Sequence, residues 1–510
     1  MQKTGLGLTM IVAIALLSGL AADSAAASKQ ELIVNRKAEG VSLDPAKTTA
    51  MEDYAVMANL YSSLFRFKPN SFELRPDLAL DYKTSSDGKF VSFNLRKGVK
   101  WHKGYGEFTS EDVKFTIDRV LNPATQSRFA TNFANIERVE TDGPYIVNFY
   151  LKAPDATLLQ RLTVTRPSGG LIVSKKAVTE LGDKYASQPI GTGPFVFESH
   201  VPREKVVLVA NKEYYEGPPK LERVTFVPIA DETTAAMALE SGDIHISQFE
   251  NIELLESYRK HKNLQIVTGG RVTDHMYLMN TRKAPFDNVK VRQAMAYGIN
   301  RDEIIAGIFS GYADKPTGVI HPDMFGYSKD VKTYPYDPAR AKALLKEAGY
   351  PNGFKTEVVV LTYGNWQKVN ELIKAQLAKI GIDMKIQMLE RGSYVKARAS
   401  DTTDLVMFGI TQPPDPDFIL GDVFHSTQIP PGGLNLSRYD KVDDLIVKGR
   451  AEMNLKKRAD LYAEIGKKMA EDLPTVVLYH PKWTEIINKK VKNYSVERLG
   501  GFWLYPVSLE

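Results

Sequence analysis

The sequence predicts an α/β fold, and the clearest support is a βαβ unit within residues 356–389. A continuous apolar run at residues 358–361 suits a strand that is buried on both faces. Apolar side chains then recur at helical spacing through residues 372–380, Gly381 ends the helix, and residues 384–389 form a second strand. Strands joined in this way are parallel, and open α/β sheets bind ligands at the carboxyl ends of their strands.

Other segments agree with a mixed fold. Residues 90–95 read Phe-Val-Ser-Phe-Asn-Leu, an alternation typical of a strand with one buried face. Thr109 to Asp112 predicts a helix N-terminus, and Asn300 with Glu303 predicts a second one. Asp337-Pro338 opens a helix that Gly349 closes. A further strand at residues 405–408 leads into Gly409-Ile-Thr-Gln-Pro-Pro-Asp-Pro-Asp-Phe418, which we expect to form one wall of a ligand site.

The N-terminus predicts export. Lys3 is followed by an apolar stretch at residues 6–20, and Ala25-Ala26-Ala27 provides small residues for a signal peptidase, so we expect the mature chain to begin at Ser28. A lipoprotein signal needs a cysteine after the cleavage point, and the chain has no Cys. We therefore expect a protein that is not lipidated and that stays in the space between two membranes.

The composition and charge of the chain indicate which kinds of binding partner to expect. Of 510 residues, 43% are hydrophobic and 25% are charged, which is typical of a globular protein too large for a single core. The net charge of +5 is spread along the chain without a basic run, so we expect no nucleic-acid partner and no anionic membrane surface. No later segment approaches the ~18 apolar residues of a membrane span.

Catalytic patterns are missing. The sequence contains no Gly-x-Ser-x-Gly, no phosphate-binding loop and no His-Glu-x-x-His, and its eight histidines are dispersed. The adjacent carboxylates at residues 111–112 and 443–444 are explained by helix polarity or exposure. We therefore expect no catalytic residues, no cofactor and no metal site.

Several short blocks of the sequence resemble the conserved pattern of one known protein family. The run Asn94-Leu-Arg-Lys-Gly-Val-Lys-Trp-His102, followed by Phe108 to Val113, resembles the signature of the dipeptide, oligopeptide and nickel type of extracellular solute-binding proteins, known as family 5. Further blocks with the family's pattern occur in the same order along the chain: 43–45, 76–79, 190–195, 285–301 and 337–349. Lys103 departs from the pattern, because an Asp is common there.

This resemblance implies a two-lobe clamp of the periplasmic-binding-protein type II, with a hinge and an extra inserted domain. The division it implies is a signal peptide at 1–27, a discontinuous lobe I at 28–70, 190–269 and 480–510, an inserted domain at 71–189, and a lobe II at 270–479. It also implies a monomer that captures its ligand by lobe closure and delivers it to the inner-membrane permease of an ABC importer.

The resemblance also implies ligand contacts. Peptide-binding members carry an Asp in the loop after the 405–408 strand, where it pairs with the peptide's α-amino group. With Asp415-Pro416 as the anchor of the alignment, Gln412 takes that position here, and an amide supplies no countercharge. The alternative is that Asp415 turns inward and makes the pair.

Apolar side chains supply the remaining candidates for the ligand site. They lie just after the block at 43–45, on a strand that carries residues 276 and 278, or beside the loop after 405–408, and each is as well suited to the core as to the cleft. They are Tyr54, Tyr61, Met276, Leu278, Phe408 and Ile410.

The expected function is therefore a periplasmic receptor for a peptide or peptide-sized solute. The missing Asp leaves an opine-like or oligosaccharide ligand as an alternative within the same role. A secreted hydrolase and a periplasmic chaperone remain alternatives of another class.

Overall fold

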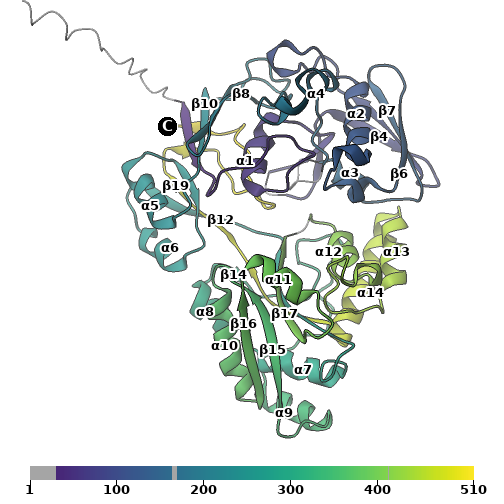
Figure 1. Cartoon of the computed structure of the whole chain (residues 1–510), viewed down its shortest axis with the longest axis vertical. Helices are drawn as coiled ribbons and strands as arrows, with labels where there is room; N and C mark the ends of the chain where they lie inside the picture. Colours follow the sequence, from purple (N-terminus) through teal and green to yellow (C-terminus); the bar gives the residue numbers. More distant parts are fainter. Residues whose placement is uncertain (1–29, 70, 164–168, 412) are drawn as a thin grey trace, which may run out of the picture.

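The computed structural model of the chain describes residues 30–69, 71–163, 169–411 and 413–510. Figure 1 shows two bodies of mixed helix and strand, one above the other, which confirms the predicted α/β class. One body is built on a seven-stranded sheet and the other on a six-stranded sheet. We call them lobe I and lobe II, and each is defined by its sheet.

The lobe I sheet is assembled from strands that lie far apart in the chain. Its central strand β1 (Glu31–Asn35) is parallel to β10 and β11, and the remaining neighbours are antiparallel. Leu32 and Val34 are fully buried in one core, whereas Ile33 packs on a second core across the sheet. The order is β12 (Leu264–Gly269), β19 (Trp483–Asn488), β11 (Ile246–Gln248), β1, β10 (Arg223–Val227), β9 (Lys205–Ala210) and β8 (Phe195–Val201), and the helices are α1 (Met51–Leu60), α5 (Glu232–Ser241) and α6 (Ile252–Tyr258).

A four-stranded antiparallel sheet packs beside lobe I. Its strand β5 spans Phe90–Leu95, as predicted, and buried and partly exposed side chains alternate along it. The helix predicted after Thr109 is also confirmed, and the Thr109 N–H donates to the Asp112 carboxylate at 3.0 Å. The elements of this part are β4 (Ala79–Thr84), β5, β7 (Ile146–Leu151) and β6 (Ile136–Thr141), the helices α2 (Ser110–Leu121), α3 (Leu158–Arg161) and α4 (Lys175–Leu181), and the hairpin of β2 (Phe65–Phe67) and β3 (Leu74–Pro76).

Lobe II contains the predicted βαβ unit. Strands β15 (Phe354–Leu361) and β16 (Ile382–Leu389) are parallel and are joined through α10 (Trp366–Ala378). Because β17 (Leu405–Thr411) is parallel to β15, the carboxyl ends of these three strands meet at one edge of the sheet. The other strands are β13 (Thr273–Met279), β18 (Thr475–Pro481) and β14 (Ala313–Asp314).

The helix starts predicted in lobe II are confirmed. Asn300 accepts a hydrogen bond from the Glu303 N–H at 3.2 Å, and Asp337 accepts one from the Arg340 N–H at 2.9 Å. Gly349 follows the second of these helices with a φ of +90°, a conformation that glycine adopts without strain. The helices are α7 (Val289–Gly298), α8 (Arg301–Phe309), α9 (Pro338–Glu347), α11 (Arg391–Arg398), α12 (Pro416–Val423), α13 (Asp443–Ala451) and α14 (Leu455–Asp472).

The remaining regular elements are short. Two strands, β20 and β21, pair with each other near the C-terminus, and five 3₁₀ helices lie in connections. They are β20 (Val491–Lys492) and β21 (Ser508–Leu509), and the 3₁₀ helices His102–Gly104, Pro123–Thr125, Ala130–Phe133, Gly182–Ala186 and Ser426–Gln428.

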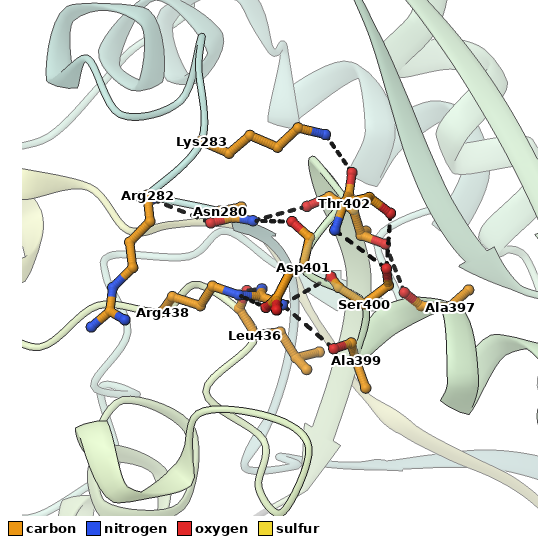
Figure 2. Close-up of polar contacts among 11 residues, drawn as sticks. Asn280, Arg282, Lys283, Ala397, Ala399, Ser400, Asp401, Thr402, Leu436 and Arg438 are labelled. Carbon is orange, nitrogen blue, oxygen red and sulfur yellow. Dashed lines mark hydrogen bonds and ion pairs between the residues drawn. The ribbon is translucent and has the colours of Figure 1, made fainter.

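A buried arginine fixes the turn that leads into β17. Arg438 donates to the Ser400 carbonyl at 2.8 Å and pairs with Asp401 at 3.0 Å (Figure 2). Asn280 and Lys283, which follow β13, donate to backbone carbonyls of the same turn. The beginning of β17 is therefore tied to the end of its neighbour β13, so the strand that carries the predicted ligand loop is firmly held.

The chain passes between the lobes at two neighbouring places. β12 ends at Gly269 in lobe I and β13 begins at Thr273 in lobe II, while β18 ends at Pro481 and β19 begins at Trp483. Paired short connections of this kind have the geometry of a hinge. A Cβ at Gly270 would lie 2.9 Å from Nη2 of Arg498, so glycine allows the C-terminal segment to approach the first connection.

Candidate functional site

A hollow lies at the two crossings, where lobe I and lobe II meet. It holds about 520 Å³, part of it open to solvent. Lobe I contributes the residues after β11, and lobe II contributes the loop between β15 and α10 with side chains of β13 and β18. We call it the hinge hollow, and its polar lining includes Glu250, Arg271, Tyr363, Asn365, Tyr479 and Lys482.

The topology of lobe II explains why the loop after β15 reaches this hollow. The loop leaves the carboxyl edge of the parallel strands, where α/β sheets commonly bind ligands. Trp366 then begins α10, and its Nε1 donates to Nδ1 of His275 on β13 at 3.3 Å. Burial lowers the pKa of His275 to about 3, with Arg271 and His480 acting in the same direction, so this imidazole is neutral at neutral pH.

Glu250 joins the two lobes at the hinge hollow. Its side-chain Oε1 accepts a hydrogen bond from the Tyr363 hydroxyl at 3.0 Å. Its backbone carbonyl accepts one from Asn365 Nδ2 at 3.4 Å. Because Glu250 follows β11 of lobe I and its partners follow β15 of lobe II, these bonds form only when the lobes are close together.

Arg271 is, with Lys482, one of the basic side chains in the polar lining of the hinge hollow. Its guanidinium carbon lies 4.4 Å from the ring centroid of Trp483, which belongs to the second crossing. Burial lowers the pKa of Arg271, although Tyr363 and Glu250 oppose that effect. The hollow therefore presents a carboxylate and a guanidinium together, an arrangement suited to a ligand that carries both charges.

A second hollow lies against lobe I, beside β2 and the C-terminal segment. It is lined by Tyr54, Arg66, Phe72, Glu497, Arg498 and Trp503, among others, and we call it the lobe I pocket. The Arg66 guanidinium carbon lies 3.6 Å from the centroid of Trp503. Burial raises the pKa of Glu497 to about 7, and Arg66 opposes that rise.

Contacts between the lobes continue on both sides of the hinge. Arg498 of the C-terminal segment forms an ion pair with Asp323 of lobe II. On the other side, Arg161 at the end of α3 lies 4.7 Å from the ring centroid of Phe418 in α12. Figure 1 shows α3 above α12 and α13, across the gap between the two bodies.

Of the two polar residues predicted to contact the ligand, the structure describes only Asp415. Gln412 lies outside the described residues. Asp415 is fully buried at the start of α12, where its carboxylate pairs with Arg458 through bonds of 2.5 and 2.7 Å and accepts the Asp417 N–H at 3.0 Å. Gln160 also approaches it, at 3.3 Å.

The predicted aromatic residues of lobe I lie in two environments. Tyr54 lines the lobe I pocket. Tyr61 is fully buried in the lobe I core, and its hydroxyl donates to the Leu43 carbonyl at 2.9 Å.

The predicted apolar residues of lobe II pack in its core. Met276 and Leu278 on β13 are fully buried, Phe408 on β17 is 5% exposed, and Ile410 is partly buried against the same cluster. None of these four side chains lines the hinge hollow or the lobe I pocket in the described part of the chain.

Sequence reasoning missed the residues that the two lobes bring together. Glu250, Arg271 and Trp483 belong to segments that no local pattern connects. Tyr363 and Trp366 had a usable signal, because they directly follow the strand predicted at residues 358–361, and the rule about carboxyl ends applies to that strand as well.

Metal sites and membrane-spanning helices were also sought among the residues that the structure describes. Among residues 30–69, 71–163, 169–411 and 413–510, no three His, Cys, Asp or Glu side chains are grouped to hold a metal ion. No helix within these ranges is both long and apolar enough to cross a bilayer.

Comparison with known proteins gives a consistent result. A family profile described as bacterial extracellular solute-binding proteins, family 5, middle region, matches residues 73–431. The glutathione-binding protein GsiB of Escherichia coli O1:K1 is 30% identical over 97% of this chain and 96% of its own length.

Two solved structures extend the similarity to the fold. The periplasmic binding protein DppA of Helicobacter pylori, in complex with the peptide STSA, has a TM-score of 0.78 and 32% identity and covers 94% of this chain and 98% of its own. MoaA of A. tumefaciens R10, in complex with mannopinic acid, has a TM-score of 0.78 and 28% identity and covers 95% and 100%. The predicted fold class, a two-lobed α/β clamp, is thereby confirmed.

Proposed function

Because the chain belongs to the bacterial extracellular solute-binding proteins of family 5, we propose that it is the periplasmic receptor of an ABC importer and captures a peptide or peptide-sized solute between its lobes. The observation that carries this proposal is the hinge hollow, to which both lobes contribute. A ligand that contacts both lobes favours the closed arrangement, and a permease can recognise that arrangement. Binding of this kind requires no covalent chemistry.

The location and partners belong to the same proposal. Members of the family are periplasmic or extracellular binding proteins. For this chain we propose cleavage before Ser28, no lipid anchor, a monomeric receptor and an inner-membrane ABC permease as partner; residues 1–29 lie outside the described structure. The domain boundaries predicted above remain part of the proposal.

A ligand other than an ordinary peptide is the second candidate. Gln412 stands where peptide-binding members carry an Asp, and a structural relative is solved with mannopinic acid. Both observations favour an opine-like solute within the same receptor role, and an oligosaccharide remains a further alternative.

Lobe closure gives the direct test of the proposed function. Adding a library of tripeptides to the purified protein is expected to reduce its radius of gyration in solution scattering and to raise its Tm, because only the native state binds. Mass spectrometry should recover the peptides unchanged. Peptide hydrolysis would instead indicate an enzyme, and an unchanged radius and Tm would contradict a receptor for peptides.

Gln412 offers a test of ligand class. Gln412→Asp is expected to improve the affinity for free-amine tripeptides about tenfold, because a hydrogen bond to a charged group is worth roughly 0.5–2 kcal/mol more than a neutral one and about 1.4 kcal/mol corresponds to tenfold. Calorimetry on N-acetylated peptides should show no gain. Gln412→Asn is the matched control, since it has the shape of Asp without the charge, and an equal gain in this variant would contradict the electrostatic explanation.

A further inference from the structure

Arg271 lacks a direct hydrogen-bond or ion-pair partner among the described residues, although the Glu250 carboxylate acts on it at longer range and opposes the lowering of its pKa. Its Nε is buried without a hydrogen bond, and the guanidinium forms no ion pair with any described residue. Glu250 lines the same hollow, but its Oε1 is engaged by Tyr363. A largely desolvated guanidinium without acceptors is unfavourable unless a ligand supplies them.

Tyr479 adds a second unused donor to the hinge hollow. Its hydroxyl is buried and donates no hydrogen bond in the part of the chain that the structure describes, although the Trp366 indole lies close enough to oppose the rise of its pKa. Burial also holds the pKa of this phenol above its ordinary value, so the hydroxyl stays protonated and able to donate. Arg271 and Tyr479 therefore offer N–H and O–H donors at one hollow.

The other basic residues at the hollow do not supply a free positive charge in place of Arg271. Lys482 pairs with Asp314 at 3.1 Å and donates to the Gly311 carbonyl at 3.3 Å. His275 is neutral because its pKa is lowered to about 3. Arg271 is thus the charged group of this hollow that lacks a partner among the described residues.

The position of Arg271 is fixed before any ligand arrives. Its guanidinium stacks on Trp483, and Trp483 Nε1 in turn donates to Glu485 at 2.8 Å. A pre-positioned planar fork of N–H donors is the geometry that binds a carboxylate through two parallel hydrogen bonds.

We propose that Arg271, assisted by the Tyr479 hydroxyl, binds a carboxylate of the transported solute, so that the solute class is a carboxylic acid. This inference rests on the proposed receptor function and adds the ligand's chemistry to it. The carboxylate can be the C-terminus of a peptide or the acid group of a solute such as mannopinic acid. Arg271 lies on the first crossing, so its bond to the ligand couples binding to the hinge.

The experiment compares three probes by calorimetry: a tripeptide library with free C-terminal carboxylates, the same library as C-terminal amides, and mannopinic acid. The native protein is expected to bind at least one carboxylate-bearing probe ten times or more tightly than the amides. Arg271→Gln should lose at least tenfold for that probe, and Arg271→Lys should lose less. The matched control is Arg282→Gln, which removes an exposed arginine paired with Asp440 in lobe II and should leave affinity unchanged.

A more conservative variant separates an effect on binding from an effect on folding. Tyr479→Phe removes only the hydroxyl, and about a threefold loss for the same probe with an unaltered Tm is expected. Equal affinity for acids and amides, or unchanged affinity in Arg271→Gln, would overturn the carboxylate inference and leave the receptor function standing. Failure of all three probes to bind the native protein would count against the proposed function itself, and the inference would fall with it.

Discussion

In Asp415→Asn, the free energy of unfolding is expected to fall by about 3–5 kcal/mol, the usual cost of removing one partner from a buried ion pair. The Arg458 side chain is 3% exposed and that of Asp415 is 1% exposed. Burial disfavours the Arg458 cation, but Asp415 outweighs burial, so the pKa of Arg458 is raised. The variant removes the carboxylate that is hydrogen-bonded to this cation and leaves only the more distant Asp417, while Asn remains a good N-cap for α12.

Asp417→Asn is the matched control for this effect. Asp417 lies in the same helix and pairs with Arg450, whose side chain is 41% exposed. Burial raises the pKa of Asp417 to about 6, so its charge is already disfavoured. Asp417→Asn is expected to cost less than Asp415→Asn, because the Arg450 cation that it leaves behind reaches solvent, as measured by urea unfolding of both variants.

A double variant separates the charge effect from packing. Replacing the pair with apolar residues, Asp415→Leu with Arg458→Met, should recover much of the lost stability, because no unpaired charge remains. If Asp415→Asn unfolds like the native protein, then the Gly449 carbonyl and the Tyr462 hydroxyl, which also accept from Arg458 at 2.9 Å, are sufficient partners. The same result would free Asp415 to meet a ligand's ammonium group.

This pair also shows which part of the site the sequence could predict. Asp415 was recognisable as a member of the loop after β17, because a local strand and a rule about carboxyl ends located that loop. Its partner Arg458 lies 43 residues later on α14, and only the tertiary packing of α12, α13 and α14 brings the two together. An alternative role in ligand binding therefore stayed open at the level of sequence.

The fold was more predictable than the site because its signals are local. β5, the helix starts at Thr109, Asn300 and Asp337, and each strand and helix of the βαβ unit taken singly are predicted from residues that are close together in the sequence. The hinge hollow has no such signal. Its lining comes from segments near residues 250, 271, 363 and 483, which meet only after both sheets have formed.

Tyr61 and Met276 show that the sequence also does not decide whether an apolar residue lies in the core or in the cleft. The sequence suggested both as cleft candidates, and the structure places both at 0% exposure inside the lobes. An aromatic or Met side chain fits a core and a binding wall equally well, and burial is decided by neighbours that a single sequence does not identify.

Glu485 gives the second large effect, which depends on pH. This residue of β19 is fully buried and accepts hydrogen bonds from Trp483 Nε1 at 2.8 Å and from the Tyr494 hydroxyl at 2.5 Å. Burial raises its pKa from 4.5 to about 7, although these two bonds oppose the rise. The folded state therefore holds the proton more tightly than the unfolded state, and the associated stability, present below pH 4.5, is lost as the pH rises through 7.

Glu485→Gln removes this titration, so the variant should gain on the native protein as the pH rises. A shift of this size corresponds to roughly 3 kcal/mol. We expect the difference in unfolding free energy, variant minus native, to increase by about that amount between pH 4 and pH 8, as measured by urea unfolding at each pH.

Buried histidines such as His275, whose lowered pKa favours the folded state at higher pH, are present in both proteins and cancel in the difference. Glu213→Gln, which alters an exposed ion pair with Lys100 in place of a buried carboxylate, should change the difference much less over the same range. A constant difference for Glu485→Gln as well would mean that Glu485 titrates as it does in the unfolded chain. Because Trp483 donates to Glu485 and lies against Arg271, the same variant also tests whether an uncharged acceptor is enough to hold Trp483 beside that arginine.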